Sequence, residues 1–276
     1  MISKKRVAKV LNVSRSALYW KNKKVQMKRY RKKEDPEVLV EINKILEVRP
    51  TYGYKRVTAM INKTRNKKNE NKLNKKRIYR IMDMNGLLLK KEKIMREHEA
   101  TGKIITLHSN TRWCSDGLEI KCFNGEKVYV AFALDCCDRE AIGHVASKKP
   151  LLAKDIQDLM LLAVEKRFGE PRTKREIQWL SDRGSIYRSL ETVQIGRYLG
   201  LKCCYTAPYS PSSNGMAESF VGTLKRDYVY VSDCYDADWV IKMLPEWIAD
   251  YNSEAPHSGL NMMSPLEYKK SIKLGV

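Results

Sequence analysis

Apolar residues recur at helical spacing in three successive segments between residues 34 and 90. Each segment places its apolar positions on one face, which predicts a helix that packs by that face. Pro36 stands at a first-turn position, and Asn85-Gly86 forms a typical C-terminal cap. A polar stretch, residues 64–72, predicts a loop between the last two helices. Residues 34–90 are therefore expected to form a small helical unit.

A shorter pair of amphipathic segments precedes this unit, in residues 5–23. Asn12 breaks the first apolar run, and Ser14 can cap a second helix by accepting a backbone N–H. This order predicts a helix-turn-helix segment over residues 1–30. Its second helix would present three side chains to DNA phosphates and base edges: Arg15, Ser16 and Tyr19.

The pattern changes from helical spacing to strands at Trp113. Five segments bounded by turn residues are expected to be strands: 113–123, 127–137, 141–149, 176–182 and 202–207. Four helices are expected among and after them, the last interrupted by Pro245: 151–169, 189–200, 216–229 and 237–252. Three strands followed by alternating helices and strands predict an α/β fold, with a mixed five-stranded sheet and helices against it.

A tight turn at Asn124-Gly125 joins the first two expected strands. If this turn pairs its two flanking residues, Asp116 lies opposite Ala133. Asp135 would then lie diagonally across from Asp116 on the same face of the sheet. This register makes Asp135 a candidate to support any site built on Asp116.

Positive charge is confined to the part of the chain before the strands. The chain carries 53 Lys+Arg and 32 Asp+Glu, a net charge of +21. Residues 1–109 hold 31 of the basic and 10 of the acidic residues, whereas residues 110–276 hold 22 of each. The first segment is expected to bind a polyanion, because neutralised phosphates release their condensed counterions. Basic side chains of the helical unit are candidate DNA contacts: Lys55, Arg56, Lys76 and Arg77.

Composition does not favour a membrane or secreted protein. No run of about 18 apolar residues is present, and the N-terminus lacks the apolar region of a secretory signal. Seven cysteines, some of them adjacent, predict reduced thiols in a cytoplasmic protein. Zinc binding is disfavoured, because the paired close spacing of structural zinc ligands is absent among His98, His108, Cys114 and Cys122.

Three acidic residues stand on separate expected elements. Asp116 lies within the first strand, Asp182 ends the fourth, and Glu218 lies in the first turn of a helix. Carboxylates brought together in this way can hold two Mg²⁺ ions about 3.5–4 Å apart, a pair that promotes in-line attack at a phosphodiester. Most of the 32 acidic residues are expected to be solvated surface groups, so the hypothesis depends on the set of three.

The helix of Glu218 carries further candidate residues. Gly222 and Lys225 share the face of Glu218 at helical spacing, so Lys225 could hold a substrate phosphate. Gly222 leaves room for a backbone to approach closely. Asn214 could cap this helix, and Gly215 could allow its sharp entry. The candidate site therefore extends along one helical face, with Asn214 as a possible supporting residue.

The chain resembles the DDE insertion-sequence transposases at these motifs. The resemblance rests on WCSD around Asp116, on the 35 residues between Asp182 and Glu218 with their flanking motifs, and on Lys225. It is strongest to the bacterial type whose catalytic subunit is encoded by a second, frameshifted reading frame. These proteins are similar to retroviral integrases and have a ribonuclease-H-like core.

The resemblance covers nearly the whole chain and implies its organisation. The implied parts are a helix-turn-helix segment, a second helical DNA-binding unit, a connector and an integrase-like catalytic core: residues 1–30, 34–90, 91–110 and 111–276. Residues 251–268 resemble the C-terminal signature of the family. One departure is Ala255, where many relatives carry Arg or another polar residue. If that position contacts DNA, activity could be reduced.

The resemblance also implies a reaction. Asp116, Asp182 and Glu218 become the metal-binding catalytic residues, with Mg²⁺ as cofactor and Mn²⁺ as a substitute. Water would nick a transposon end, and the freed 3′-hydroxyl would attack another phosphodiester without a covalent protein–DNA intermediate. The implied partners are double-stranded DNA (inverted-repeat ends and target), further copies of the chain in a synaptic complex, and an upstream-frame DNA-binding protein as a fusion. Association with the bacterial nucleoid is expected.

Two other functions stay open on the sequence. The same core could belong to a ribonuclease-H-like DNA nuclease that does not join strands. The chain could also be an inactive DNA-binding relic. The relic is disfavoured because Asp116, Asp182, Glu218 and Lys225 are all intact, whereas a relic is free to lose them.

Overall fold

The computed structural model describes Val10 and three longer ranges: residues 32–89, 106–206 and 214–273. The chain packs as two compact units, residues 1–37 and 38–276. The expected helix-turn-helix, with Arg15, Ser16 and Tyr19, lies outside the described residues. Within the described ranges, no helix is long and apolar enough to cross a membrane.

Three helices form the small helical unit: α2 (Asp35–Val48), α3 (Tyr54–Lys67) and α4 (Lys75–Met84). Their apolar faces meet in one cluster of buried side chains, which confirms the helical periodicity. Asn74 caps α4 with a side-chain hydrogen bond, and Gly86 follows its end with a φ of 69°. The expected loop begins later than predicted, since α3 runs to Lys67 and Arg65 in its last turn pairs with Glu41 of α2 at 2.6 Å.

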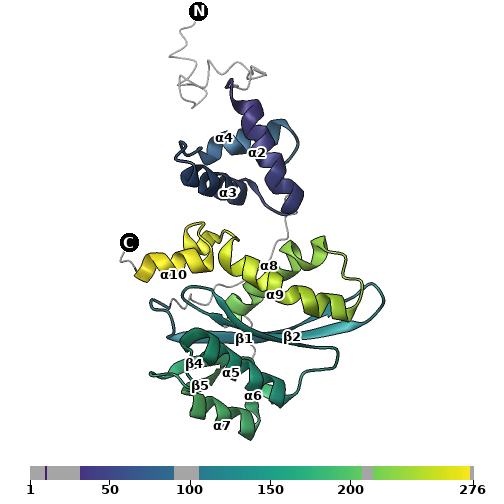
Figure 1. Ribbon diagram of the computed structural model, residues 1–276, viewed down its shortest axis with the longest axis vertical. Helices are drawn as coiled ribbons and strands as arrows, with labels where there is room; N and C mark the ends of the chain where they lie inside the picture. Colours follow the sequence, from purple (N-terminus) through teal and green to yellow (C-terminus); the bar gives the residue numbers. More distant parts are fainter. Residues whose placement is uncertain (1–9, 11–31, 90–105, 207–213, 274–276) are drawn as a thin grey trace, which may run out of the picture. The chain divides into compact units, whose positions relative to one another are not determined.

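A five-stranded mixed sheet forms the centre of the part of the chain that follows the helical unit (Figure 1). Its strands are β1 (Arg112–Lys121), β2 (Lys127–Asp135), β3 (Ala141–Ser147), β4 (Ile177–Ser181) and β5 (Leu201–Tyr205). Their spatial order is β3-β2-β1-β4-β5. The strands β1, β2 and β3 pair antiparallel, whereas β4 is parallel to both β1 and β5. The predicted mixed five-stranded sheet is therefore confirmed.

Helices cover both faces of this sheet (Figure 1). One face carries α5 (Ala153–Phe168) and α7 (Leu190–Leu199), and the other carries α8 (Gly215–Asp227) and α9 (Ala237–Ser253). Each pair of helices closes its own cluster of buried side chains, and neighbouring residues of a strand enter different clusters. The pattern did not predict four short elements: α6 (Ser185–Arg188), η3 (Val229–Val231), η4 (Ser258–Leu260) and α10 (Pro265–Lys273).

The seven cysteines are all free thiols, in agreement with the sequence. Cys114 and Cys122 are buried in the cluster under α8 and α9, whereas His108 is exposed. Within the described ranges, no group of His, Cys, Asp and Glu side chains forms a metal site. The buried thiols therefore behave as apolar core residues.

Pro245 does not interrupt the last long helix, contrary to the expectation. The helix α9 continues through it from Ala237 to Ser253. Pro245 is exposed, while Leu244 and Trp247 beside it are buried against the sheet. Packing of this apolar face offsets the hydrogen bond that the proline cannot donate.

The register of β1 and β2 differs by one residue from the predicted one. Asp116 pairs with Phe132 and not with Ala133. The last pair before the turn is Lys121 with Lys127, so the connection is longer than a two-residue turn. A shift of one residue moves each side chain of a strand to the other face relative to its partner strand. The structure therefore changes which β2 residues share a face with Asp116.

Candidate active site

Asp116 and Asp182 come from neighbouring parallel strands. β1 pairs with β4 as far as Cys114 opposite Leu180, and each aspartate lies two residues further along its own segment. Cys114 and Leu180 both pack in the cluster under α8 and α9. The two-residue period of extended chain puts the two aspartates on this same face. The parallel register therefore brings together two carboxylates that are far apart in the sequence.

Glu218 reaches the same face from the first turn of α8. Two residues later on this helix, Phe220 is buried against Phe132 of β2, with 4.5 Å between the ring centroids. The ring of Phe220 also meets Tyr251 of α9 edge-on at 4.8 Å. These aromatic contacts hold the start of α8 on the sheet, so the position of Glu218 is set by core packing.

Asn214 positions this helix in a way that the sequence did not predict. It stands at the N-cap of α8, but its side chain makes no capping hydrogen bond. The Asn214 side-chain amide instead donates to the Ser115 carbonyl of β1 at 3.2 Å. Because Ser115 precedes Asp116, this hydrogen bond ties the start of α8 to the strand that carries the first carboxylate.

The three carboxylates affect one another electrostatically. Partial burial raises the pKa of Asp116, and the nearby charges of Asp182 and Glu218 raise it further. The Gly117 N–H, which donates to Asp116 Oδ1 at 2.8 Å, acts in the opposite direction. A bound cation relieves repulsion of this kind, because it favours the charged form of each carboxylate.

The donor set fits a hard divalent cation in its chemistry. Mg²⁺ binds carboxylate oxygens and keeps several waters, and Asp182 and Glu218 are exposed while Asp116 is half-buried. The side chains do not form a closed ligand cage, since no described group of three acidic, His or Cys side chains meets at one point. The Asp182 Oδ1 instead accepts the N–H of Gly184 at 3.0 Å. The placement and type of the three residues therefore suit a metal ion. Asp116 and Asp182 each accept a nearby backbone N–H in this arrangement.

Tyr187 is a further residue of the site, and it was not predicted from the sequence. It is buried, and its hydroxyl lies 3.1 Å from Ser115 Oγ. Burial raises the pKa of the Tyr187 hydroxyl, and the charges of Asp116 and Asp182 raise it further. The Tyr187 ring packs in the cluster under α5 and α7, so its hydroxyl reaches Ser115, the residue before Asp116, from the other face of the sheet. Its sequence signal is the motif SDRGSIY, where it follows Asp182 by five residues.

Asp135 does not support the carboxylates, which corrects the prediction made from the turn. It pairs with Trp113 across β1 and β2, on the face covered by α5, and accepts the Trp113 indole N–H at 3.2 Å. Arg167 of α5 pairs with Asp135 at 3.3 Å, with Asp138 at 2.5 Å and with Glu140. This buried network holds the β2–β3 connection against α5, away from the candidate metal ligands.

Known proteins match the chain over almost its full length. The family described as integrase core domain matches residues 107–211 and, in a second form, 199–265, and the HTH-like domain matches 33–93. The transposase InsD for insertion element IS2A/D/F/H/I/K of Escherichia coli is 42% identical over 274 residues, covering 95% of this chain and 89% of the relative. The transposase InsD for IS2-11 of Escherichia coli strain K12 is also 42% identical, covering 95% and 87%. The chain belongs to the insertion-element transposase family.

Solved structures show weaker likenesses to the transposase. The simian T-cell lymphotropic virus intasome, in complex with PP2A regulatory subunit B56 gamma, matches with a TM-score of 0.49 and 14% identity over 83% of this chain and 73% of that one. The catalytic core domain of BIV integrase matches with a TM-score of 0.41 and 18% identity, over 60% and 98%. Family membership stands on the sequence relatives, and the sheet has the ribonuclease-H-like order expected of an integrase core.

The basic residues of the helical unit differ in their availability to DNA. Lys55 and Lys76 are exposed, and Arg77 is half-buried. Arg56 is engaged inside the transposase, because it forms an ion pair of 2.7 Å with Asp227, where the two side chains are 17% and 1% exposed. Arg56 is therefore held by an internal partner, and its predicted DNA contact stays a prediction. No local pattern in the sequence indicates this pair, whose partners lie 171 residues apart.

The exposed face of α8 is open around Lys225. Lys225 is half-buried and lies two turns after Glu218, as predicted. A Cβ added to Gly222 between them would meet nothing within 4 Å. Packing inside the transposase therefore does not require glycine at this position, and the open face leaves room for a substrate.

Ala255 has a structural explanation. Its side chain is completely buried, and its N–H donates to the Asp250 carbonyl at 3.2 Å. The methyl group of Ala255 is therefore part of the core of this protein.

Proposed function

We propose that this transposase cuts and joins DNA at Asp116, Asp182 and Glu218. The parallel register of β1 and β4, which puts two carboxylates on the face of the sheet that α8 covers, is the observation that carries the proposal. The raised pKa of Asp116 supports it, because the charges of the other two carboxylates contribute to that shift. Three interacting carboxylates on an integrase core suit metal-dependent phosphodiester chemistry.

The cofactor would be Mg²⁺, with Mn²⁺ as a substitute. When bound, a pair of these ions would activate the attacking hydroxyl and stabilise the leaving oxygen. Asp116 and Asp182 would offer carboxylate oxygens from neighbouring extended segments. Glu218 would offer its own from a helix that core packing holds on the sheet. Lys225 would hold a phosphate of the substrate from the same helix.

The reaction would proceed in two displacements at phosphorus. In the first, water attacks the phosphodiester at a transposon end, and the bond to the 3′-oxygen breaks to leave a 3′-hydroxyl. In the second, that hydroxyl loses its proton and attacks another phosphodiester, from which a second 3′-oxygen leaves. One P–O bond replaces another in the joining step, so no external energy source is required.

The DNA partners follow from the division of charge. The two helical parts, residues 1–30 and 34–90, would bind the inverted-repeat ends, and the core of residues 111–276 would act on the ends and the target. The candidate contacts of the second part are Lys55, Arg56, Lys76 and Arg77, and Arg56 also pairs with Asp227. Pairing of two ends would require further copies of the chain. An upstream-frame DNA-binding protein would act as a fused partner, and the enzyme would work at the nucleoid.

The test is strand joining by variants of the carboxylates. The substrate is a duplex that carries the inverted repeat flanking the gene. Asp182→Asn and Glu218→Gln should reduce joining by more than about 100-fold, since even groups that only support metal ligands are worth 10–100-fold. Binding of the end should be retained. Two exposed acids on α5 provide matched controls, Asp158→Asn and Glu165→Gln, which should join at the normal rate. Joining retained by both site variants would refute the assignment.

The two alternative functions are separated by a pre-cleaved substrate. A duplex end with a free 3′-hydroxyl is supplied together with a target plasmid and Mg²⁺. Joined product identifies a transposase that completes strand transfer. Hydrolysis without joined product would indicate a nuclease, and end binding without either product would indicate an inactive relic.

A further inference from the structure

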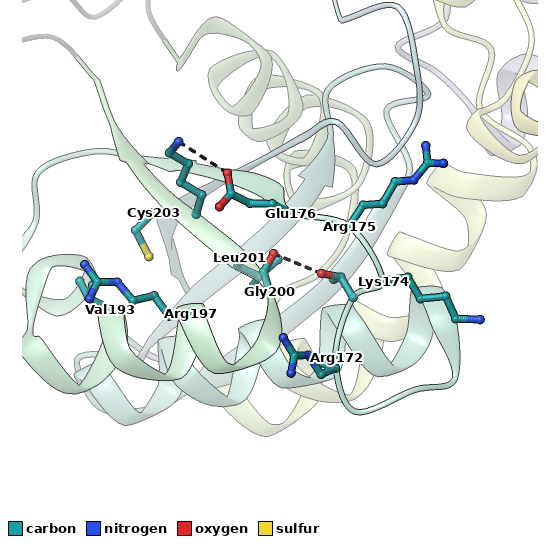
Figure 2. A pocket seen from close by; sticks show the side chains of 11 residues that line it. Arg172, Lys174, Arg175, Glu176, Val193, Arg197, Gly200, Leu201 and Cys203 are labelled. Carbon is teal, nitrogen blue, oxygen red and sulfur yellow. Dashed lines mark hydrogen bonds and ion pairs between the residues drawn. The ribbon is translucent and has the colours of Figure 1, made fainter.

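A basic pocket lies at the other end of β4 from Asp182, between the loop before β4, the end of α7 and the start of β5 (Figure 2). Its volume is about 540 Å³. Five of the lining residues are cationic: Arg172, Lys174, Arg175, Arg197 and Lys202. The lining also includes one acidic residue, Glu176. Because residues 110–276 carry equal numbers of basic and acidic residues, this excess of positive charge is a local feature.

The pocket is built on a fixed backbone. Thr173 is buried, its N–H donates to the Leu199 carbonyl at 2.9 Å, and its hydroxyl donates to the Gly200 carbonyl at 3.1 Å. Gly200 has a φ of 82°, and a Cβ there would lie 2.2 Å from Thr173 Oγ1. This close approach requires glycine. The loop is therefore held against the end of α7, and its cationic side chains project from a defined framework.

The cationic side chains spread around the pocket and do not converge on one point. Figure 2 shows Arg172 and Arg197 on either side of Gly200, while Lys174 and Arg175 extend away from Arg197. Pockets for small molecules are mostly apolar with a few convergent polar groups, which is not the arrangement here. A spread of cations suits an extended polyanion whose charges are distributed along its length.

Glu176 does not neutralise this surface. It pairs with Lys202 at 3.5 Å, and the two side chains are 65% and 59% exposed. An ion pair so exposed contributes little to stability, because water screens it. A polyanion can therefore displace Glu176 from Lys202 at little cost, which leaves all five cations available.

We propose that this pocket binds the phosphate backbone of duplex DNA as a second contact surface of the catalytic core. The inference rests on the proposed function for the nature of its ligand. Glu176 precedes β4 and Asp182 follows it, so the five residues of β4, which make six residue steps from Glu176 to Asp182, separate the pocket from the carboxylates. Such a length spans about 20 Å, which corresponds to about six base pairs of duplex. Phosphate contacts at that distance would fix the duplex while its reacting phosphodiester lies at the carboxylates.

Lysine acetylation of the full chain tests the contact directly. The Asp182→Asn variant is used so that DNA is not consumed and the result does not depend on catalysis. A random-sequence duplex at saturation should slow acetylation of Lys174 and Lys202 several-fold. Two exposed lysines of the same domain, Lys121 and Lys149, should react at their normal rates. Equal rates at all four lysines with and without DNA, or equal slowing at all four, would overturn the proposal.

A second arm separates DNA from small phosphates. ATP or inorganic pyrophosphate replaces the duplex at a matched concentration of phosphate groups. Protection of Lys174 and Lys202 by the duplex alone supports a DNA surface. Protection by the small phosphates equal to that by DNA would make the pocket a small-anion site and overturn the assignment.

A third arm measures the charge contribution of the pocket. The triple variant Arg172→Gln, Arg175→Gln and Arg197→Gln is compared with a variant that removes the same charge from exposed positions elsewhere, Lys121→Gln, Lys149→Gln and Lys242→Gln. The slope of log K against log[salt] should fall by about 0.9 for each DNA phosphate that the pocket variant no longer neutralises. The control should keep its slope. Equal slopes in the two variants, with matching unfolding midpoints, would contradict the proposal even if the catalytic assignment is correct.

Discussion

His257 shows how burial sets the chemistry of single residues in this protein. The pKa of His257 is lowered to about 4, mainly by burial and in addition by the charges of Arg56 and Arg139. Its ring meets Tyr251 edge-on, with 4.6 Å between the ring centroids. The same physical cause acts in the opposite direction on Asp116, where burial raises the pKa of an acid. Burial therefore disfavours the charged form of both side chains.

The stability of the protein should fall between pH 6.5 and pH 4, partly because of His257. In this window the unfolded chain takes up a proton at His257 that the folded chain excludes, so acid favours unfolding. One pKa unit corresponds to about 1.4 kcal/mol, so His257→Gln should reduce the acid-induced loss of unfolding free energy by at most about 3 kcal/mol. Urea unfolding at both pH values measures the difference. His108 is exposed, so His108→Gln should lose as much unfolding free energy between the two pH values as the unchanged protein. Equal losses in the His108 and His257 variants would contradict the prediction.

At the scale of elements, α8 is held at both of its ends. Asn214 ties its start to β1. Asp227 at its last residue accepts hydrogen bonds from Arg56 at 2.7 Å and from Thr51 at 2.6 Å. The helix that carries Glu218 is therefore linked both to the strand of the first carboxylate and to residues of the helical DNA-binding region.

Asp227→Asn should destabilise the protein by about 1–3 kcal/mol, because it leaves the Arg56 charge without its partner in a poorly hydrated place. A loss of this kind lowers Tm by about 2–4 °C per kcal/mol in a domain of this size. Asp238→Asn is the matched control, because its pair with Lys148 is 80% and 46% exposed and should contribute at most about 1 kcal/mol. Thermal unfolding of the two variants side by side provides the measurement. Equal changes in Tm would show that the Asp227 pair acts as an ordinary surface contact.

At the scale of the whole molecule, charge is divided between two functions. Residues 1–109 carry the entire net charge of +21, and the remainder is neutral overall. The basic part is suited to holding DNA through many phosphates. The neutral part can then concentrate negative charge at the carboxylates, where a metal ion is expected, and positive charge at the basic pocket.

This division predicts different salt dependences for the two parts. A fragment of residues 1–109 should bind duplex DNA with an affinity that falls steeply as the salt concentration rises. The slope of log K against log[salt] should steepen by about 0.9 for each phosphate contacted. A fragment of residues 106–276 should show a shallower slope, set by the few contacts of the core. Fluorescence anisotropy across a salt series measures both slopes. A flat response of the basic fragment would contradict the charge argument.

Much of the fold could be predicted from the sequence, because helix and strand periodicities are local properties. The apolar faces of α2 to α4 and the five strands were readable over short windows. The 35-residue gap between Asp182 and Glu218 indicated the candidate site before any distance was known. The break expected at Pro245 was wrong, since tertiary packing of α9 outweighed a strong local signal.

The sequence by itself determined most of the elements, the placement of charge and the choice of three candidate carboxylates. Only the tertiary structure decided which residues meet. The length of the β1–β2 connection sets a register that turns Asp135 away from Asp116. Packing joins Arg56 to Asp227 and places the Tyr187 hydroxyl against Ser115, the residue before Asp116. Such contacts depend on loop length and on packing between residues that are distant in the sequence, which no local pattern encodes.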